Sequence, residues 1–420
     1  MINRNIGSPI RWVPTLYFAM GVPFVALSLV SVLMFSDLGI SDAQIAFWSS
    51  LILLPYTLKP LWSPLLELYK TKKFFVVLTQ LISASAFVLI ALALPLPNFF
   101  TYVIAIMGLM AFSGATHDIA ADGVYMDVLN SSAQAKYIGW QGVFYNLAKI
   151  ITNGGLVFLA GMLSDLYGPL HAWIIIMLIC GVMLSLIGIY HMKYLPKSNV
   201  NTSKKMEIGG LKEVFVSFFK KKHILYYLAF IVFYRFAEGF AMKIAPLFFK
   251  ASVESGGLGL STQEIGLLYG TCGTVAFILG SLSSGYVIAD KGLKNIIFKL
   301  VSIFNIPFVV YLLLAIFQPQ NLWVIGAGIV VEYFGYGFGF VGLTLYMMQE
   351  IADGPHKMAH YAFASGVMNL GVMIPGMMSG YISDLLGYEY FFTWVMIATI
   401  PIFFISLKLP FKPIETTQEN

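Results

Sequence analysis

Acidic residues inside apolar segments are the first candidates for chemistry in this chain. Asp118 and Asp122 lie four residues apart in an apolar run, so a helix places both on one face. Two nearby carboxylates repel each other when both are ionised, which favours proton binding by one of them. Alternatively, a cation such as Lys59 neutralises them as a structural pair. His117, next to Asp118, could relay a proton or serve as a hydrogen-bonded structural histidine.

A second apolar run carries both signs of charge. Arg235 and Glu238 are three residues apart and can pair across one helical turn. Arginine stays charged in proteins, so Arg235 suits a fixed anion-binding role; the alternative is an ion pair that only holds the helix. Lys243 either binds an anion or reaches the membrane interface. Glu332, in a later apolar run, joins Asp118, Asp122 and Glu238 as a candidate proton-coupling acid.

Polar side chains form a stripe on another apolar segment. Gln141, Tyr145 and Lys149 follow one another at steps of four, with Asn146 alongside. Such a stripe either lines a water-filled path that binds a solute or makes hydrogen bonds between helices. Tyr336 lies in a run of alternating glycines and aromatic residues. Its ring could stack on a sugar, while the glycines favour close helix packing.

The composition indicates what must position these residues. The 420-residue chain is 59% hydrophobic and only 11% charged, whereas soluble proteins are about 25% charged. Its long continuous apolar runs are typical of helices that each need about 20 residues to span a membrane, rather than of barrel strands. We expect an all-α membrane protein with twelve transmembrane helices, at 12–36, 44–66, 73–95, 99–126, 137–163, 170–195, 224–250, 263–288, 295–317, 321–348, 357–383 and 390–410.

The distribution of lysine and arginine predicts the orientation. If the N-terminus is inside, 20 of the 25 basic residues fall in inside segments and only Lys250 falls in an outside segment. Cytoplasmic loops carry an excess of Lys and Arg, so both termini are expected in the cytoplasm. The longest connection is basic, and it predicts three parts: an N-terminal six-helix bundle at 1–195, a cytoplasmic linker at 196–222 and a C-terminal six-helix bundle at 223–420.

An internal repeat supports this division. The segment Gly161–Gly168 (GMLSDLYG) resembles Gly380–Gly387 (GYISDLLG), 219 residues further along the chain. A repeat of six helices is typical of transporters that bind their solute near the midplane between two halves.

Signals of other functional classes are lacking in the sequence. We find no phosphate-binding glycine loop and no metal-ligand cluster, so we expect no cofactor, and an ion gradient as the energy source. Cys180 and Cys272 lie in apolar runs and are expected to be small buried residues. A membrane-embedded enzyme or a sensor is the alternative from another class. We expect neither, because no nucleophile–base pair stands out and the chain has no soluble sensing domain.

Two motifs resemble one branch of the major facilitator superfamily, the AmpG-type muropeptide permeases. Lys59–Glu67 (KPLWSPLLE) resembles their K-x-L-W-S-P-x-x-D/E segment, and Thr116–Gly123 (THDIAADG) resembles T-Q-D-I-x-x-D-A, with His117 replacing glutamine and Gly123 replacing alanine. The second motif continues to Asp127. Related acetyl-coenzyme A transporters share this general pattern.

The resemblance implies a major facilitator fold of two pseudo-symmetric six-helix bundles. It also implies proton-driven import of N-acetylglucosaminyl-anhydromuramyl peptides across the bacterial inner membrane. We expect a monomer that binds no nucleic acid. The anionic peptide of such a solute suits Arg235, Lys149 or Lys243. The gating or structural ion pairs are expected to involve Lys59, Glu67, His117 and Asp127, with Lys59 a few ångströms from Asp118, Asp122 or Glu67. The alternative is transport, including export, of another sugar, peptide or amphiphile.

Overall fold

The computed structural model describes residues 8–62, 66, 71–129, 131–196, 215–352 and 357–411. Almost all of these residues are helical, and no strand occurs among them. The expectation of an all-α membrane fold is therefore confirmed.

The N-terminal half contributes long helices interrupted by short irregular turns. These elements are α1 (Val13–Val25), the π-helical turn η2 (Ala26–Val30), α2 (Ser31–Asp37), α3 (Asp42–Leu51), α4 (Leu54–Leu58), the 3-10 turn η3 (Lys59–Leu61), α6 (Lys72–Ala93), α7 (Phe99–Val128), α8 (Ser131–Lys149), the π-helical turn η4 (Ile150–Leu156), α9 (Val157–Tyr167) and α10 (Pro169–Tyr194).

The C-terminal half repeats this pattern. Its elements are α12 (Ile224–Tyr234), α13 (Phe236–Lys250), α14 (Thr262–Ile265), the π-helical turn η6 (Gly266–Cys272), α15 (Gly273–Lys291), α16 (Leu293–Asn305), α17 (Val309–Phe317), α18 (Leu322–Tyr346), the π-helical turn η8 (Met347–Ile351), α19 (Lys357–Ala398) and α20 (Ile400–Leu407).

Ten helical segments of the described chain are long and apolar enough to cross a membrane. The expected span at 44–66 is not among them, because its helix is broken: α3 ends at Leu51 and Pro55 stands in the first turn of α4. Proline has no N–H to donate, so Pro55 cannot continue the hydrogen-bond ladder of α3 and instead occupies the first turn of a new helix, where that N–H would have no partner. This span is therefore a set of short helices rather than one rod.

The two last expected spans are joined in one segment, His360–Leu407. At about 1.5 Å per residue, 48 helical residues would far exceed a hydrocarbon core of about 30 Å. Gly387 divides the segment, because its φ of 72° and ψ of 164° are not helical. Gly168, the matching residue of the internal repeat, has φ 80° and ψ 159° and ends α9. Both positions need glycine, since a Cβ disfavours positive φ.

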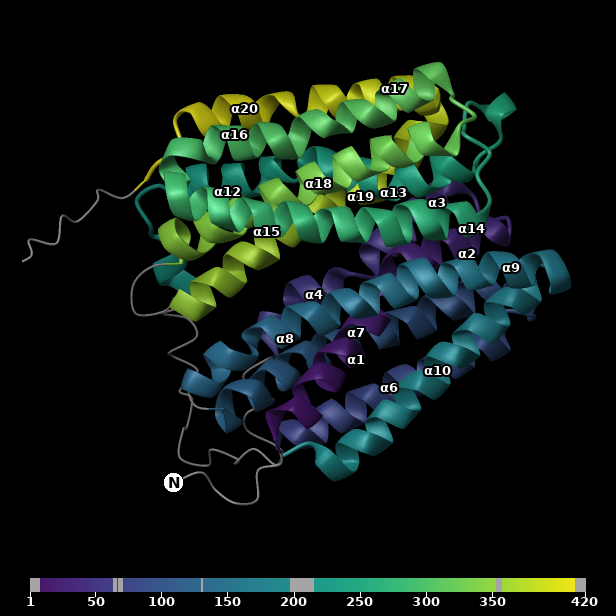
Figure 1. Ribbon diagram of the computed structural model, residues 1–420, viewed down its shortest axis with the longest axis horizontal. Helices are drawn as coiled ribbons and strands as arrows, with labels where there is room; N and C mark the ends of the chain where they lie inside the picture. The colour runs from purple at the N-terminus through teal and green to yellow at the C-terminus, as the bar shows by residue number, and fades with distance from the viewer. Residues whose placement is uncertain are drawn as a thin grey trace, which may run out of the picture.

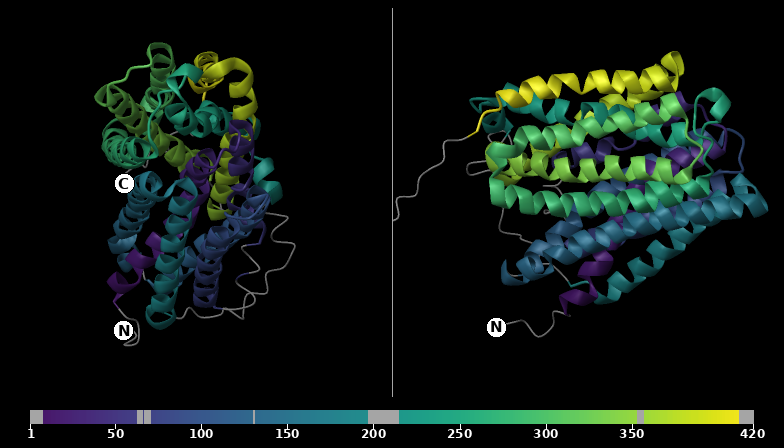
Figure 2. Two further views of the ribbon diagram at one scale, coloured as in Figure 1. Left: turned by 90° about the vertical axis from the view of Figure 1, so that its right-hand side faces the viewer. Right: turned by 45° about the horizontal axis from the view of Figure 1, so that its top comes forward.

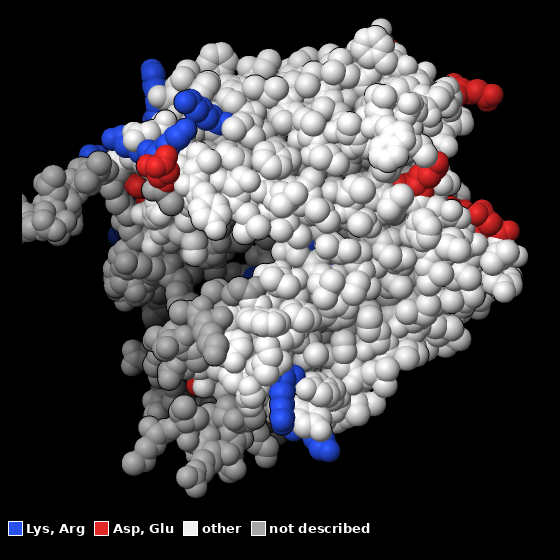
Figure 3. Space-filling view, viewed as in Figure 1, with Lys and Arg blue, Asp and Glu red and all other residues white. Residues whose placement is uncertain are grey.

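The helices form two groups that meet at one end of the molecule and separate at the other (Figures 1 and 2). The closed end carries the α2–α3, α9–α10 and α13–α14 connections. The open end carries the start of α1, the end of α20 and the segment 215–222. Figure 3 shows a hollow between the groups towards the open end, with basic side chains visible inside it. The division at 196–222 stays a prediction, because 197–214 lie outside the described residues.

Asp37, at the end of α2, links the two halves at the closed end. Its carboxylate pairs with Lys250 at the end of α13, and it accepts hydrogen bonds from Thr262 Oγ1 (3.1 Å) and Trp173 Nε1 (2.8 Å). Lys250 and Thr262 belong to the C-terminal half, whereas Trp173 lies on α10. We call these four residues the Asp37 latch.

Candidate functional site

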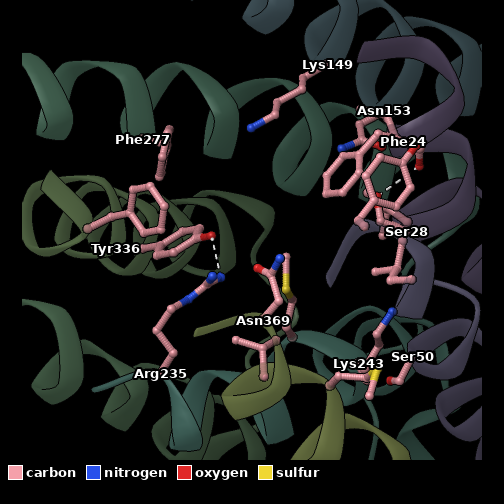
Figure 4. Close-up of a pocket in the computed structure, with 18 of the residues that line it drawn as sticks. Phe24, Ser28, Ser50, Lys149, Asn153, Arg235, Lys243, Phe277, Tyr336 and Asn369 are labelled. Carbon is pink, nitrogen blue, oxygen red and sulfur yellow. Dashed lines mark hydrogen bonds between the residues drawn. The ribbon is translucent and has the colours of Figure 1, made fainter. Parts of the chain in front are cut away.

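A cavity of about 380 Å³ lies between the two halves. Figure 4 shows Lys149 extending from the end of α8, and Arg235 and Lys243 from the α12–α13 span, towards this space. Both halves supply its walls, which include Phe24, Ser28, Ser50, Tyr56, Tyr145, Lys149, Asn153, Arg235, Met242, Lys243, Tyr269, Phe277, Tyr333, Tyr336, Phe340, Met368 and Asn369.

Irregular helical turns place these side chains. Ser28 lies in η2, Asn153 in η4 and Tyr269 in η6, and all three turns are π-helical. Arg235 stands at the break between α12 and α13, with φ −109° and ψ 7°. Broken and π-helical turns change the direction of side chains within a span and are frequent at functional sites.

Arg235 is the most strongly held of the three cations. Its side chain donates to Glu238 through Nε (2.6 Å) and Nη2 (2.5 Å), which confirms the predicted pair. Nη2 also lies 3.4 Å from the Tyr336 hydroxyl, and the guanidinium carbon lies 5.2 Å from the centre of the Phe340 ring. Because this bidentate arrangement matches a carboxylate, Arg235 can exchange Glu238 for a carboxylate on a solute.

The two lysines have weaker partners. Lys149 Nζ lies over the rings of Tyr145 (5.0 Å) and Phe277 (5.4 Å). Lys243 Nζ donates to the carbonyl oxygen of Ser49 at 3.2 Å, so the expectation that it reaches the membrane interface is wrong. Among the described residues, neither lysine has a carboxylate partner.

The cavity therefore carries a positive charge. Three basic residues line it, and no aspartate or glutamate does so in the described part of the chain. A buried charge without a partner is costly, and a solute carrying negative charge removes that cost. Aromatic rings on both sides, among them Phe24 and Tyr336, add flat apolar surfaces.

A second, much smaller cavity adjoins the first. Its volume of about 20 Å³ is enough for one water molecule. Glu238 and Glu332 both line it, and Met242, Tyr269, Tyr333 and Tyr336 line both cavities. The hydroxyl of Tyr311 donates to Glu332 Oε2 at 2.8 Å.

The two acids of α7 lie away from the central cavity. Asp118 Oδ2 is 3.7 Å from Lys59 Nζ, which is one of the contacts that the sequence predicts for Lys59. Asp122 accepts a hydrogen bond from the Tyr17 hydroxyl at 2.9 Å. The two motifs that resemble AmpG-type permeases also meet through Trp62, whose Nε1 lies 3.2 Å from Thr116 Oγ1.

The remaining predicted gating residues have separate surroundings. His117 is buried, and its Nε2 is 3.0 Å from Gln80 Nε2. Asp127 pairs with Lys72 at 2.8 Å. Glu67 lies outside the described residues.

Two predicted solute-binding residues are not brought to the cavity. Gln141 donates to the Tyr17 hydroxyl at 2.6 Å, and Asn146 donates to the Gly142 carbonyl within its own helix. Conversely, sequence reasoning missed Asn369, Ser50 and Tyr56. Asn369 interrupts an otherwise apolar segment, so its polarity could have identified it, whereas nothing in the sequence distinguishes Ser50 or Tyr56 from packing residues.

Comparison with known proteins agrees with this architecture. The anhydromuropeptide permease of Escherichia coli (strain K12) is 23% identical over 395 residues, covering 91% of this chain and 76% of that protein. A Rickettsia felis transporter named AmpG 4 is 24% identical over 402 residues, covering 93% of each protein. The solved structure of a bacterial homologue of the human lysosomal transporter Spinster, in an inward-facing and unoccupied conformation, has a TM-score of 0.70 at 15% identity. That match covers 97% of this chain and 100% of that chain.

These matches confirm the resemblance to AmpG-type permeases and the all-α membrane fold. A sequence model of the Major Facilitator Superfamily matches residues 15–360, most of the chain. The chain therefore belongs to the Major Facilitator Superfamily, a family of membrane transporters.

Proposed function

We propose that this protein imports anionic sugar-peptides, N-acetylglucosaminyl-anhydromuramyl peptides, across the bacterial inner membrane together with protons. The observation that carries the proposal is the cationic cavity between the halves, with Lys149, Arg235 and Lys243 in its walls. Its aromatic rings suit the sugar faces, and its basic residues suit the carboxylates of the peptide.

The relatives support the choice of solute. The permease of Escherichia coli is named for anhydromuropeptides, and its similarity extends over nearly the whole of this chain. The cationic and aromatic lining of the cavity supports the same choice of solute independently of the relatives.

We assign the open end to the cytoplasm. The segment 215–222 and the α15–α16 connection, whose lysines predict cytoplasmic loops, lie at the open end (Figure 1). The described conformation is then inward-facing, and import requires the closed end to open and the open end to close. Residues 1–195 and 223–420 would move as two bundles around the central cavity.

The test is uptake of a radiolabelled N-acetylglucosaminyl-anhydromuramyl tripeptide into proteoliposomes with an acidic exterior. We expect accumulation above the external concentration, and loss of that accumulation when a protonophore collapses the gradient. The same level of accumulation with and without the pH gradient would refute proton coupling. Lack of uptake, with uptake of a different labelled sugar or peptide, would favour the alternative of a transporter for another amphiphilic solute.

A further inference from the structure

Glu332 on α18 is a buried carboxyl group for which the described residues provide no cationic partner. Its residue is 5% exposed, and its Oε2 accepts a hydrogen bond from Tyr311. No lysine or arginine in the described part of the chain forms an ion pair with it. Burying an isolated carboxylate costs several kcal/mol, so such a group is stable mainly in its neutral, protonated form.

Glu238 on α13 is equally buried but charge-balanced. It is 3% exposed, and both of its oxygens accept hydrogen bonds from Arg235. Arg235 also lines the central cavity, where a solute carboxylate would bind. When a carboxylate of the solute pairs with the guanidinium of Arg235, Glu238 loses its cationic partner. Like Glu332, it is then a buried carboxyl group without a cation.

From this arrangement we propose that Glu238 and Glu332 form a two-carboxyl proton site, in which Glu332 holds a resident proton and Glu238 binds the transported proton when an anionic solute displaces it from Arg235. The inference rests on the proposed function for the identity of the solute. It names the site at which proton binding and solute binding are linked.

The charges balance in both states. Without solute, Arg235 is positive, Glu238 is negative and Glu332 is neutral. When a solute carboxylate pairs with Arg235, an O–H bond forms on Glu238 with a proton delivered by water, and the net charge of protein plus solute carboxylate and proton is unchanged. Release of the solute into the cytoplasm reverses both steps, because Glu238 loses its proton as it pairs again with Arg235.

The water-sized cavity connects the carboxyl groups of Glu238 and Glu332. Glu238 and Glu332 both line it, and it shares Tyr269, Tyr333 and Tyr336 with the central cavity. A water molecule there can donate to one carboxyl group and accept from the other. The charged and titratable groups that face the two carboxyls from the surrounding described elements are Arg235, Tyr234, Tyr269, Tyr311, Tyr333 and Tyr336, of which Arg235 alone is a cation.

Infrared difference spectroscopy tests the site without solute, because the carbonyl stretch of a protonated carboxyl is distinct from that of a carboxylate. For protein in liposomes at neutral pH, we expect Glu332→Gln to lack one protonated-carboxyl band of the wild type. Glu332→Asp should shift that band, and Glu389→Gln, at an exposed position, should leave it unchanged. An unchanged spectrum for Glu332→Gln would overturn the resident proton.

Arg235→Gln imitates the displacement of Glu238. We expect this variant to gain one protonated-carboxyl band, and the double variant Arg235→Gln with Glu238→Gln to lack the gained band. No gain in Arg235→Gln would overturn the role of Glu238. With the labelled tripeptide, the wild type should take up about one proton per solute bound in weakly buffered solution, and Glu238→Gln should take up none. Failure of the tripeptide to bind would overturn the proposed solute, while the spectra would still decide the proton site.

Discussion

Gly161 and Gly380 occupy matching positions in the two halves, and each lets its helix touch the backbone of the opposite half. A Cβ at Gly161 on α9 would lie 2.6 Å from the backbone nitrogen of Gln263 in α14. A Cβ at Gly380 on α19 would lie 2.7 Å from the carbonyl oxygen of Asp42 in α3. The internal repeat therefore supplies two related contacts that close one end of the molecule, since small residues allow helices to approach closely.

Replacing Gly380 with alanine should open the closed end. The added methyl group meets backbone atoms of Asp42 and Ala43, which cannot move aside as a flexible side chain can. Overpacking of this kind costs about 1–3 kcal/mol, which corresponds to a roughly 5- to 150-fold shift in a conformational equilibrium. Distances between spin labels at the start of α3 and next to Gly387 in α19 would measure the shift.

Gly108→Ala is the matched control for this substitution. Gly108 lies in helix α7, and nothing is within 4 Å of a Cβ built on it. We expect the control to retain the wild-type distance distribution. A Gly380→Ala variant with the same distribution as the control would show that the α3–α19 contact does not determine closure.

The Asp37 latch should contribute to the same closure through charge. Asp37→Asn retains the size of the side chain but leaves Lys250 without its carboxylate partner. Hydrogen bonds to charged groups contribute roughly 1.5–3 kcal/mol each, so labels on α2 and α13 should show an increased open population. Asp165→Asn is the comparison, because Asp165 accepts a hydrogen bond from Gln263 (2.7 Å) at an exposed position and should have a smaller effect. Equal effects of the two variants would argue against a special role for Asp37.

Much of this architecture could be predicted from local sequence. Apolar runs of sufficient length identify most of the spans, and a spacing of three residues predicts the Arg235–Glu238 pair because one helical turn fixes it. The broken span after Leu51 was not predicted in its details. Prolines are common in membrane helices, and the sequence does not say which of them ends a helix.

The position of the cavity depends on tertiary structure, so the sequence predicts it less well. Helical spacing places Gln141, Tyr145 and Lys149 on one surface, yet Gln141 contacts Tyr17 while the other two line the cavity. Which part of a stripe faces the solute depends on where the two halves separate. Asn369 comes from the opposite half, and no local spacing relates it to Lys149.

Arg235→Ala should weaken binding of an anionic solute. Loss of a charge-assisted hydrogen-bond pair of about 1.5–3 kcal/mol corresponds to roughly a 10- to 150-fold increase in Kd. Arg235→Lys keeps the positive charge but lacks the planar guanidinium that binds a carboxylate through two hydrogen bonds, so its Kd should lie between those of the wild type and Arg235→Ala. The Kd of the labelled tripeptide would be compared with the Kd of its carboxy-amidated form. For the amidated form, the Kd of each variant should differ less from that of the wild type. Equal losses for both forms would indicate a structural role for Arg235.

Asp118→Asn should separate accumulation from exchange. Asp118 lies 3.7 Å from Lys59 and does not line the central cavity, so its neutralisation leaves the solute contacts in place. Whereas Glu238 binds the transported proton at the solute site, Asp118 would act on the change between access states: it binds a proton in one state and pairs with Lys59 in the other, and an amide cannot make that change. We therefore expect gradient-driven accumulation of the labelled tripeptide to be lost while exchange against internal unlabelled tripeptide continues.

Asp122→Asn should behave in the same way if the two acids act together, although its carboxylate is bonded to Tyr17 rather than to Lys59. Full accumulation in both variants would remove α7 from the coupling mechanism and leave Glu238 and Glu332 as the acids that carry it.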